Sequence, residues 1–213
     1  MSLRIPSLLL TPLIASIVLL SAALQAEEVT NKPAVTSKIE SIVLAGGCFW
    51  CIESDYEKLD GIIDVVSGYS GGTSDNPTYK EVSAGNGGHI EVVEVTYNPQ
   101  LISHREILDF FWRHIDPTRN DGQFCDRGPQ YRPAIFYKNN IEKEVILKSA
   151  AHIEKIKTFK APLKVEFIPA SKFYPAEDYH QDYYKKNPLR YKYYRYSCGR
   201  DTRVDELWGE GVK

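Results

Sequence analysis

The sequence predicts an α+β fold in which helices pack on a sheet as a two-layer sandwich. Two observations predict this class. Short apolar runs rich in Val and Ile, typical of buried strands, recur along the chain. Between some of them lie segments whose apolar residues have helical spacing, and clusters of Gly, Asn and Pro separate the two kinds of segment. No internal repeat is visible in the sequence, so one folded domain is expected.

The first predicted unit is a strand, a tight turn and a helix. Residues 41–45 form an apolar run that is typical of a buried strand. The two glycines that follow supply the turn, because glycine adopts backbone conformations that other residues avoid. Ile52, Tyr56 and Leu59 then lie on one face of a helix. The apolar run over 62–66 predicts a second strand.

The rest of the chain continues this alternation. Ser103 and Glu106 form a capping box at the start of an amphipathic helix that ends at Asp116-Pro117. The other predicted elements are a loop over 67–77, a strand over 89–97, an irregular segment over 118–130, a strand over 132–137, a helix capped by Asn140 and running to Phe159, a strand over 163–168 and a helix over 178–186. The order strand–helix–strand–strand–helix–strand predicts a ferredoxin-like topology with long functional loops and an irregular C-terminal tail beyond Pro188.

The first 26 residues have the layout of a secretory signal peptide. Arg4 is the only charged residue before the apolar stretch over 8–24, and the small residue Ala26 precedes ordinary polar sequence. We therefore expect cleavage after Ala26, a flexible leader over 27–40 and an exported, periplasmic protein. An uncleaved membrane anchor is the alternative, because the apolar stretch approaches the length of a bilayer span.

Composition limits the partners that the exported domain can have. The chain has 26 basic and 28 acidic residues and a net charge of −2. Because there is no basic excess, we expect no binding to nucleic acid. The catalytic domain is expected over 41–190 and residues 191–213 are expected to form a tail that wraps it. We expect a monomer.

Cys48 is the strongest candidate for reactive chemistry. It lies between the glycine turn and the predicted helix, where free amide groups and the positive end of the helix dipole favour a thiolate. Phe49 and Trp50 follow directly and offer an apolar pocket. The spacing of Cys48 and Cys51 leaves two alternatives open, a structural disulfide or half of a zinc site. The zinc alternative is weak because no second cysteine pair has ligand spacing.

Glu91 is a candidate proton donor. In the predicted strand over 89–97, alternation places it on one face with Val93, Val95 and Tyr97. Burial on that face would raise its pKa and keep the carboxyl protonated near neutral pH. A neutral carboxyl can protonate a departing oxygen. The alternative is a solvated strand end.

Polar groups in the predicted loops complete the candidate set. Asp126 and Tyr131 flank an Arg-Gly-Pro turn, and Tyr79 follows Asn-Pro-Thr. Tyrosine hydroxyls can bond an oxygen atom while their rings pack against a ligand. Since the chain has 14 tyrosines, periodicity alone does not select these two.

Together these residues resemble the A-type peptide methionine sulfoxide reductases. The matching segments span about 41–190 in the family order and are Gly46-Gly47-Cys48-Phe49-Trp50, Pro77-Thr78-Tyr79, Gly88-His89-Ile90-Glu91-Val92-Val93, Asp126 with Gln130-Tyr131-Arg132, and Ala176-Glu177-Asp178-Tyr179-His180-Gln181. The resemblance implies reduction of the S-epimer of methionine sulfoxide, free or in proteins.

The resemblance also implies residue roles. They are Cys48 as nucleophile, Phe49 and Trp50 as the pocket for the substrate's ε-methyl group, Glu91 as proton donor to the sulfoxide oxygen, Tyr79 and Tyr131 as hydrogen-bond partners of that oxygen, and Asp126 as an organising group. It implies no metal and no organic cofactor. An external dithiol such as thioredoxin regenerates the enzyme by disulfide exchange.

The resolving cysteine stays open between Cys51 and Cys198. Cys51 stands where many members of the family have glycine, and it lies on the same helix face as Cys48. We favour Cys51, and Cys198 is the alternative or a second-stage shuttle. Cys125 has no assigned role and is expected to be a buried or bystander thiol.

Two other functions compete with this interpretation. Export and a Cys-x-x-Cys motif also fit a general thiol–disulfide oxidoreductase of the cell envelope, but the thioredoxin-type surroundings are absent from the sequence. A non-enzymatic binding module that uses the aromatic residues is the third class. Glu91 on an apolar strand face argues against it.

Overall fold

The computed structural model describes residues 38–211, and the predicted signal peptide and almost all of the leader lie outside them. The strands are β1 Glu40–Ala45, β2 Ile62–Ser70, β3 Ile90–Tyr97, β4 Gly122–Gln123, β5 Asp126–Arg127, β6 Ala134–Tyr137, β7 Glu166–Pro169 and β8 Tyr174–Pro175. The α-helices are α1 Phe49–Tyr56, α2 Tyr79–Ser83, α3 His104–Arg113, α4 Asn140–Ile156, α5 Tyr183–Lys186, α6 Pro188–Ser197 and α7 Arg200–Trp208. None of the described helices has the length and apolar character that a bilayer span requires.

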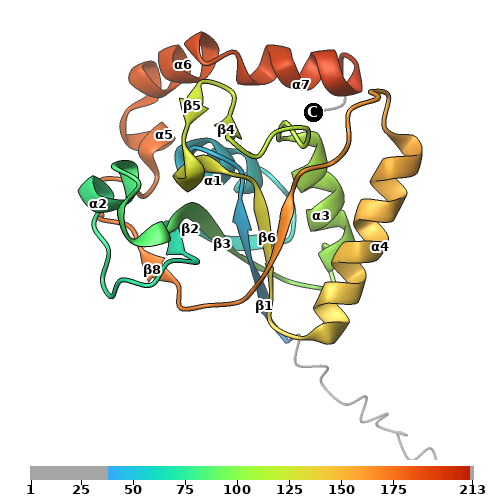
Figure 1. The fold of residues 1–213 in the computed structure, drawn as a ribbon, viewed down its shortest axis with the longest axis horizontal. Coiled ribbons are helices and arrows are strands. Elements are labelled where there is room, and N and C mark those ends of the chain that lie inside the picture. The colour runs from blue at the N-terminus through green and yellow to red at the C-terminus, as the bar shows by residue number, and fades with distance from the viewer. Residues whose placement is uncertain (1–37, 212–213) are drawn as a thin grey trace, which may run out of the picture. The chain divides into compact units, whose positions relative to one another are not determined.

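Six strands form one mostly antiparallel sheet in the order β7-β6-β1-β3-β2-β8 (Figure 1). Leu44 of β1 pairs with Val93 of β3 on one side and with Ile135 of β6 on the other. Among the strands of residues 38–211, only β6 and β7 pair in parallel, and β4 pairs with β5 in a separate hairpin. The predicted α+β class is confirmed. The ferredoxin-like topology stays a prediction, because β8 adds an edge strand that the sequence did not predict.

Both faces of the central strands are buried, which decides where Glu91 lies. Val93 and Val95 belong to the main apolar core, and Ile90 and Val92 belong to a second cluster on the other face. The alternation expected in β3 is therefore correct, and it places Glu91 on the face of the main core. On that side α3 and α4 lie next to each other, joined by a hydrogen bond from Trp112 of α3 to Ser149 of α4 (Figure 1).

The C-terminal tail is helical, so the expectation of an irregular tail is wrong. Pro188 occupies the first turn of α6, where its missing N–H costs nothing. Tyr191 is the buried residue of this helix, and Arg195 pairs with Asp55 of α1. The sequence signal was missed because α6 has almost no aliphatic residues. Its aromatic and basic side chains pack by ring contact and ion pairing instead.

Several other predicted boundaries shift. The expected loop over 67–77 begins only after Ser70, because β2 continues to that residue. The segment over 118–130 contains the β4–β5 hairpin, and the expected helix over 178–186 is limited to α5. Asn139, one residue earlier than expected, caps α4 by accepting hydrogen bonds from two backbone amides.

Candidate active site

The two glycines before α1 are required by close packing. Gly47 has φ of 84°, and a Cβ there would lie 2.5 Å from Cβ of Gln123. A Cβ on Gly46 would lie 2.6 Å from the Ile52 side chain. The turn therefore sits directly against the β4–β5 hairpin and the core, and it delivers Cys48 as the N-cap residue of α1. The Cys48 side chain is buried, at 6% exposure.

One small cavity brings the predicted catalytic and substrate-binding residues together. Its volume is about 60 Å³, roughly the space of two water molecules. The residues that line it are Cys48, Phe49, Trp50, Tyr79, Glu91, Asp126, Tyr131 and Tyr194. All seven residues predicted for catalysis or substrate binding are in this group, and Tyr194 is the addition. The cavity suits the end of a side chain and is too small for a whole amino acid.

Glu91 is buried on the cavity wall, as the strand pattern predicted. It is 2% exposed, and its carboxyl accepts a 3.2 Å hydrogen bond from the Phe49 amide, the first of α1. Burial raises the pKa of Glu91 to about 8, and the negative charge of Asp126 adds to this effect. The Phe49 amide acts against it. The carboxyl is therefore mostly protonated at neutral pH and can donate a proton.

The two thiols of α1 have opposite pKa shifts. Burial raises the pKa of Cys48 well above its ordinary value, and the hydrogen bond to Cys51 and the charges of Glu91 and Asp126 act in the same direction. The pKa of Cys51 is lowered, chiefly by the hydrogen bond from Cys48 and to a smaller extent by Arg200. The position at the start of α1 therefore does not lower the pKa of Cys48 as expected, because burial raises it and the first amide of α1 bonds Glu91 instead of the sulfur.

Aromatic rings fix the orientation of Trp50. Its indole stacks on Tyr183 with ring centroids 3.7 Å apart, and its N–H donates to Nδ1 of His180 at 3.0 Å. His180 also packs against Phe49 and Tyr79, with centroids 5.0 and 4.4 Å apart. Although the expected motif included His180, no role was predicted for it. The structure shows that it braces both predicted pocket residues.

Tyr194 is the cavity residue that the sequence did not predict. It lies on α6, and its hydroxyl donates a 2.6 Å hydrogen bond to Asp126. Burial raises the pKa of Asp126, and this hydrogen bond opposes that shift. Burial also raises the pKa of Tyr79 to about 12 and raises the pKa of Tyr131, so both hydroxyls keep their protons and can act as donors.

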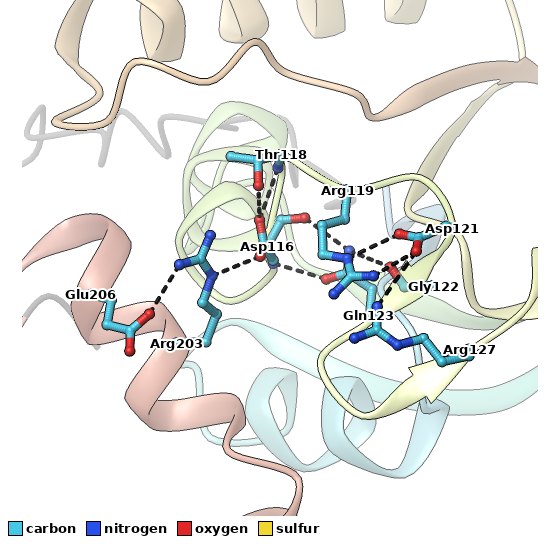
Figure 2. Close-up of polar contacts among 9 residues, drawn as sticks. All are labelled: Asp116, Thr118, Arg119, Asp121, Gly122, Gln123, Arg127, Arg203 and Glu206. Atoms are coloured by element: carbon cyan, nitrogen blue, oxygen red, sulfur yellow. Dashed lines mark hydrogen bonds and ion pairs between the residues drawn. The ribbon is translucent and has the colours of Figure 1, made fainter.

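A polar network holds the hairpin that carries Asp126. The Gln123 side chain accepts from the Asp116 amide and donates to the Asp116 carbonyl, both at 2.8 Å (Figure 2). The Asp116 carboxylate accepts from Thr118 and pairs with Arg203 of α7 at 2.8 Å. Since Gln123 is fully buried, these bonds tie the hairpin, the end of α3 and α7 into one rigid unit.

Cys125 and Cys198 form a disulfide, with Cα atoms 4.9 Å apart. The expectation of a bystander thiol at Cys125 is therefore wrong. This residue is exposed, and it links the hairpin to the end of α6. Cys48 and Cys51 are both free and buried. Of the two candidates for resolution, Cys51 packs in one cluster with Cys48, whereas the sulfur of Cys198 is already bonded.

Two groups of described side chains have metal-ligand spacing. One contains the disulfide sulfurs and Asp126, and bonded sulfurs are not thiolate ligands. The other contains Glu53, Glu57 and Asp182, where Lys185 already pairs with two of the carboxylates. A larger cavity of about 580 Å³ at the start of β1 is lined mostly by Lys, Glu and other polar residues, together with Ile39 and Ile141, and its lining has no thiol.

A buried thiol pair, a protonated acid and aromatic walls on an α+β scaffold define a thiol-dependent oxidoreductase. Residues 40–212 match the family described as peptide methionine sulfoxide reductase. The chain belongs to the peptide methionine sulfoxide reductase family.

Relatives of known name agree with this assignment. The chain is 57% identical over 174 residues to the peptide methionine sulfoxide reductase MsrA/MsrB of Vibrio cholerae, which covers 82% of this chain and 46% of that protein. The chain thus spans less than half the length of this relative. It is 48% identical to MsrA of Halalkalibacterium halodurans over 81% of this chain and 98% of that protein.

Solved structures resemble the fold as well. Mxr1 from Saccharomyces cerevisiae in reduced form has a TM-score of 0.67 and 37% identity, over 72% of this chain and 88% of Mxr1. Mxr1 in complex with Trx2 has a TM-score of 0.50 and 28% identity, over 70% of this chain and 86% of Mxr1.

Proposed function

We propose that this protein reduces methionine S-sulfoxide, free or within proteins, to methionine, with Cys48 as the nucleophile. The observation that carries the proposal is the single cavity in which Cys48 and the protonated Glu91 face the same small space. A sulfoxide placed there has a nucleophile for its sulfur and an acid for its oxygen. Family membership supports the same reaction.

The first step uses the hydrogen bond between the two thiols. When Cys51 is ionised, it accepts the proton of Cys48 through this bond, which also lowers the pKa of Cys51. The Cys48 thiolate then attacks the electrophilic sulfoxide sulfur while Glu91 protonates the oxygen. The oxygen is transferred to Cys48, which becomes a sulfenic acid, and the thioether leaves with its electron pair. Glu91 recovers a proton from solvent.

The cavity walls select and orient the sulfoxide. Phe49 and Trp50 provide apolar surface for the ε-methyl group, and Trp50 is held in place by its stack on Tyr183 and its bond to His180. The hydroxyls of Tyr79 and Tyr131 donate hydrogen bonds to the oxygen. Asp126 lies at the same wall and organises the polar side of the cavity through its bond to Tyr194.

We propose Cys51 as the resolving residue. Its thiol attacks the sulfenic acid of Cys48, a disulfide forms, and water leaves. Cys51 follows Cys48 by one helical turn and shares a buried cluster with it. Cys198 cannot act in this step while it is bonded to Cys125. An external dithiol then reduces the Cys48–Cys51 disulfide by exchange, so the cycle needs no metal or organic cofactor.

The reductant class follows from this thiol chemistry. The related Mxr1 has been crystallised with Trx2, which supports a thioredoxin-type dithiol as the partner. We further propose that the protein is exported, that the signal over 1–26 is removed, and that it acts as a monomer in the periplasm. In that compartment a thioredoxin-type protein supplied with electrons across the membrane is needed. A disulfide between Cys125 and Cys198 is consistent with an oxidising environment.

The alternative, a general thiol–disulfide oxidoreductase, is not favoured. Such an enzyme presents its first cysteine to protein disulfides on an accessible surface. Cys48 is instead buried next to an acid, in a cavity of about 60 Å³. An acid in that position serves the departure of oxygen, which disulfide exchange does not involve.

A stoichiometric assay without reductant tests the proposal. The R- and S-sulfoxides of a methionine peptide are offered separately, and the methionine formed per enzyme is measured. We expect about one equivalent from the S-epimer and almost none from the R-epimer. Intact-mass and peptide analysis should then find a new Cys48–Cys51 disulfide. Equal reduction of both epimers would contradict the proposed cavity, and a new bond from Cys48 to Cys198 would contradict the proposed resolution.

A further inference from the structure

Arg200, the first residue of α7, is a buried cation beside the turn that carries Cys48. Its side chain is 2% exposed. Its Nη2 donates one hydrogen bond to the carbonyl of Gly46 and another to the carbonyl of His114, both at 3.1 Å. The first carbonyl belongs to the glycine turn before α1 and the second to the end of α3. The guanidinium therefore ties these two segments together.

The same guanidinium contacts the β4–β5 hairpin (Figure 1). Its Cζ lies 4.4 Å from the centre of the Phe124 ring, a distance typical of a cation–π contact. Phe124 lies between β4 and β5 and has φ of 52°, in the left-handed region. Arg200 thus contacts both loops that hold cavity residues, the glycine turn before Cys48 and the hairpin that carries Asp126.

Packing alone does not account for a guanidinium at this place. The Nε of Arg200 is buried and has no hydrogen-bond partner among residues 38–211. A buried donor without a partner lowers stability, and a buried cation costs more free energy than an apolar group of similar size. A charge at this place therefore indicates a role in the chemistry beside it.

Cys51 is the thiol that this charge affects. The charged side chains around Cys51 come from α1, β3, α6 and α7 and are Asp55, Glu91, Arg195 and Arg200. Its titratable neutral neighbours are Cys48, Tyr183, Tyr184, Tyr191 and Tyr194. The hydrogen bond with Cys48 is the main cause that lowers the pKa of Cys51. Burial opposes it, and the positive charges of Arg200 and then Arg195 lower the pKa further.

The two cations near Cys51 differ in their partners. Arg195 forms ion pairs with Asp55 at 2.8 Å and with Asp201 at 2.7 Å. The hydrogen bonds of Arg200 described above go to backbone carbonyls, which carry no charge. The carboxylates therefore offset the charge of Arg195, whereas these carbonyls leave the charge of Arg200 in place. This difference agrees with the larger effect of Arg200 on the pKa of Cys51.

We propose that Arg200 is a positioning residue for the resolution step, in which it fixes the turn before Cys48 and supplies the positive charge that stabilises the Cys51 thiolate. This inference rests on the proposed function. In the resolution step the Cys51 thiolate attacks the sulfur of the Cys48 sulfenic acid, so that the S–S bond forms and the S–O bond breaks. The departing hydroxide takes a proton from solvent and leaves as water. The thiolate supplies the electron pair of the new bond, and no external oxidant or reductant is consumed.

The test separates the charge of Arg200 from its hydrogen bonds. Arg200→Lys keeps the charge, whereas Arg200→Gln removes it and keeps an N–H donor for a carbonyl. Each protein is mixed with methionine S-sulfoxide without reductant. The conversion of the Cys48 sulfenic acid to the Cys48–Cys51 disulfide is then followed by rapid quench with a thiol-alkylating reagent and mass analysis.

The two variants should differ in the pH dependence of resolution. We expect Arg200→Gln to slow resolution about tenfold at neutral pH and to regain most of the native rate about one pH unit higher, because Cys51 then ionises at higher pH. The yield of methionine per enzyme should not change. Arg200→Lys should resolve within about threefold of the native rate at both pH values, because it keeps the charge but loses the planar fork.

Arg203→Gln is the matched control on the same helix, because Arg203 pairs with Asp116 and Glu206. It should keep the native pH profile of resolution, and the Tm of every variant reports its structural cost. If Arg200→Gln slows resolution by the same factor at every pH, Arg200 gives structural support alone and the proposal is overturned. The same pH shift in Arg200→Lys as in Arg200→Gln would also overturn it.

A direct titration of Cys51 decides the matter if the Arg200 variants do not fold. In Cys48→Ser with the Cys125–Cys198 disulfide intact, Cys51 is the remaining free thiol, since the chain has four cysteines. Thiolate absorbance in the ultraviolet should then give a pKa below that of free cysteine, which is about 8.5. A pKa at or above that value would overturn the proposal.

The two hypotheses fail in different ways. If native protein produces no methionine from the S-sulfoxide, the proposed function is wrong. If methionine forms and the Arg200 variants keep the native rate and pH profile of resolution, only the role of Arg200 is wrong.

Discussion

The molecule contains two cysteine pairs with opposite character. Cys48 and Cys51 lie one helical turn apart, are buried and are free thiols. Cys125 and Cys198 are separated by 73 residues, reach the surface and form a disulfide. Two cysteine pairs in one chain can therefore differ in redox function. Cys48 of the first pair faces an acid in a cavity, with Cys51 packed beside it, and this pair suits turnover. The second pair joins two distant segments and suits structural support.

Replacing the nucleophile should have the largest effect. Cys48→Ser removes the only proposed group that attacks the sulfoxide sulfur, so we expect sulfoxide reduction to fall on the order of a thousandfold or more. Methionine formation in a single turnover, followed by chromatography, measures this directly. Substantial methionine from the variant would show that the two pairs had been assigned the wrong roles.

Glu91, which shares the catalytic cavity with Cys48, should make the rate of sulfoxide reduction depend on pH. With a pKa of about 8, Glu91 is protonated below this value and loses its proton above it. The rate of the reductive step in native protein should therefore have a bell-shaped pH profile, because ionisation of the thiol pair raises the rate with pH and loss of the Glu91 proton lowers it. Glu91→Gln should lower the rate at neutral pH on the order of a hundredfold. Stopped-flow measurements from about pH 6 to about pH 10 test this pH dependence. If Glu91→Gln keeps the native pH profile, Glu91 is not the proton donor.

Resolution of the sulfenic acid is the step in which the two cysteine pairs should differ most clearly. Cys51→Ser should still yield about one methionine per enzyme but lose steady-state turnover by about tenfold or more, because the sulfenic acid is no longer resolved quickly. The double variant Cys125→Ser with Cys198→Ser should retain turnover. The reverse pattern, with loss of turnover only in the double variant, would contradict the proposed assignment.

The free energy of unfolding, unlike turnover, should depend on the Cys125–Cys198 pair. Opening the loop of 73 residues closed by Cys125 and Cys198 should cost about 4 kcal/mol in the free energy of unfolding by the chain-entropy relation. The Tm of the double variant should then fall by roughly 10 °C. Calorimetry of native protein with and without its disulfide provides the matched measurement. An unchanged Tm would show that the second pair gives no structural support.

The smallest effect is expected for Tyr194, which lies on the helix that ends at Cys198 and lines the cavity of Cys48. Tyr194→Phe removes the hydroxyl that bonds Asp126 but keeps the ring beside Trp50. Losing one hydrogen bond of this kind costs about 1 kcal/mol. We expect the KM for sulfoxide to rise several-fold with little change in Tm. A large fall in Tm instead would make Tyr194 a structural residue only.

The sequence predicted those parts of the site that depend on local pattern. Cys48 follows a glycine turn, and Glu91 stands in an alternating strand, so each could be placed from its neighbours. Tyr194 could not be placed, because α6 packs through tyrosine rings and ion pairs rather than an aliphatic stripe. The pairing of Cys125 with Cys198 depends on how the hairpin meets α6, which no local pattern records.

The local sequence pattern also could not predict the protonation of the two thiols. A position at the start of a helix favours a thiolate only while the free amides point at the sulfur. Here the Phe49 amide bonds Glu91, which comes from a strand far along the chain. The expected low pKa of Cys48 therefore failed for a tertiary reason, whereas the expected high pKa of Glu91 follows chiefly from burial.

The close packing of Gly47 against Gln123 limits which sequence changes this part of the chain can accept in evolution. The turn that carries the nucleophile rests on the hairpin that carries Asp126, so both groups share one support. A longer hairpin or a larger residue at Gly47 would displace both sides of the cavity together. Insertions and deletions should thus be tolerated poorly in this loop, even though it looks like an ordinary surface connection.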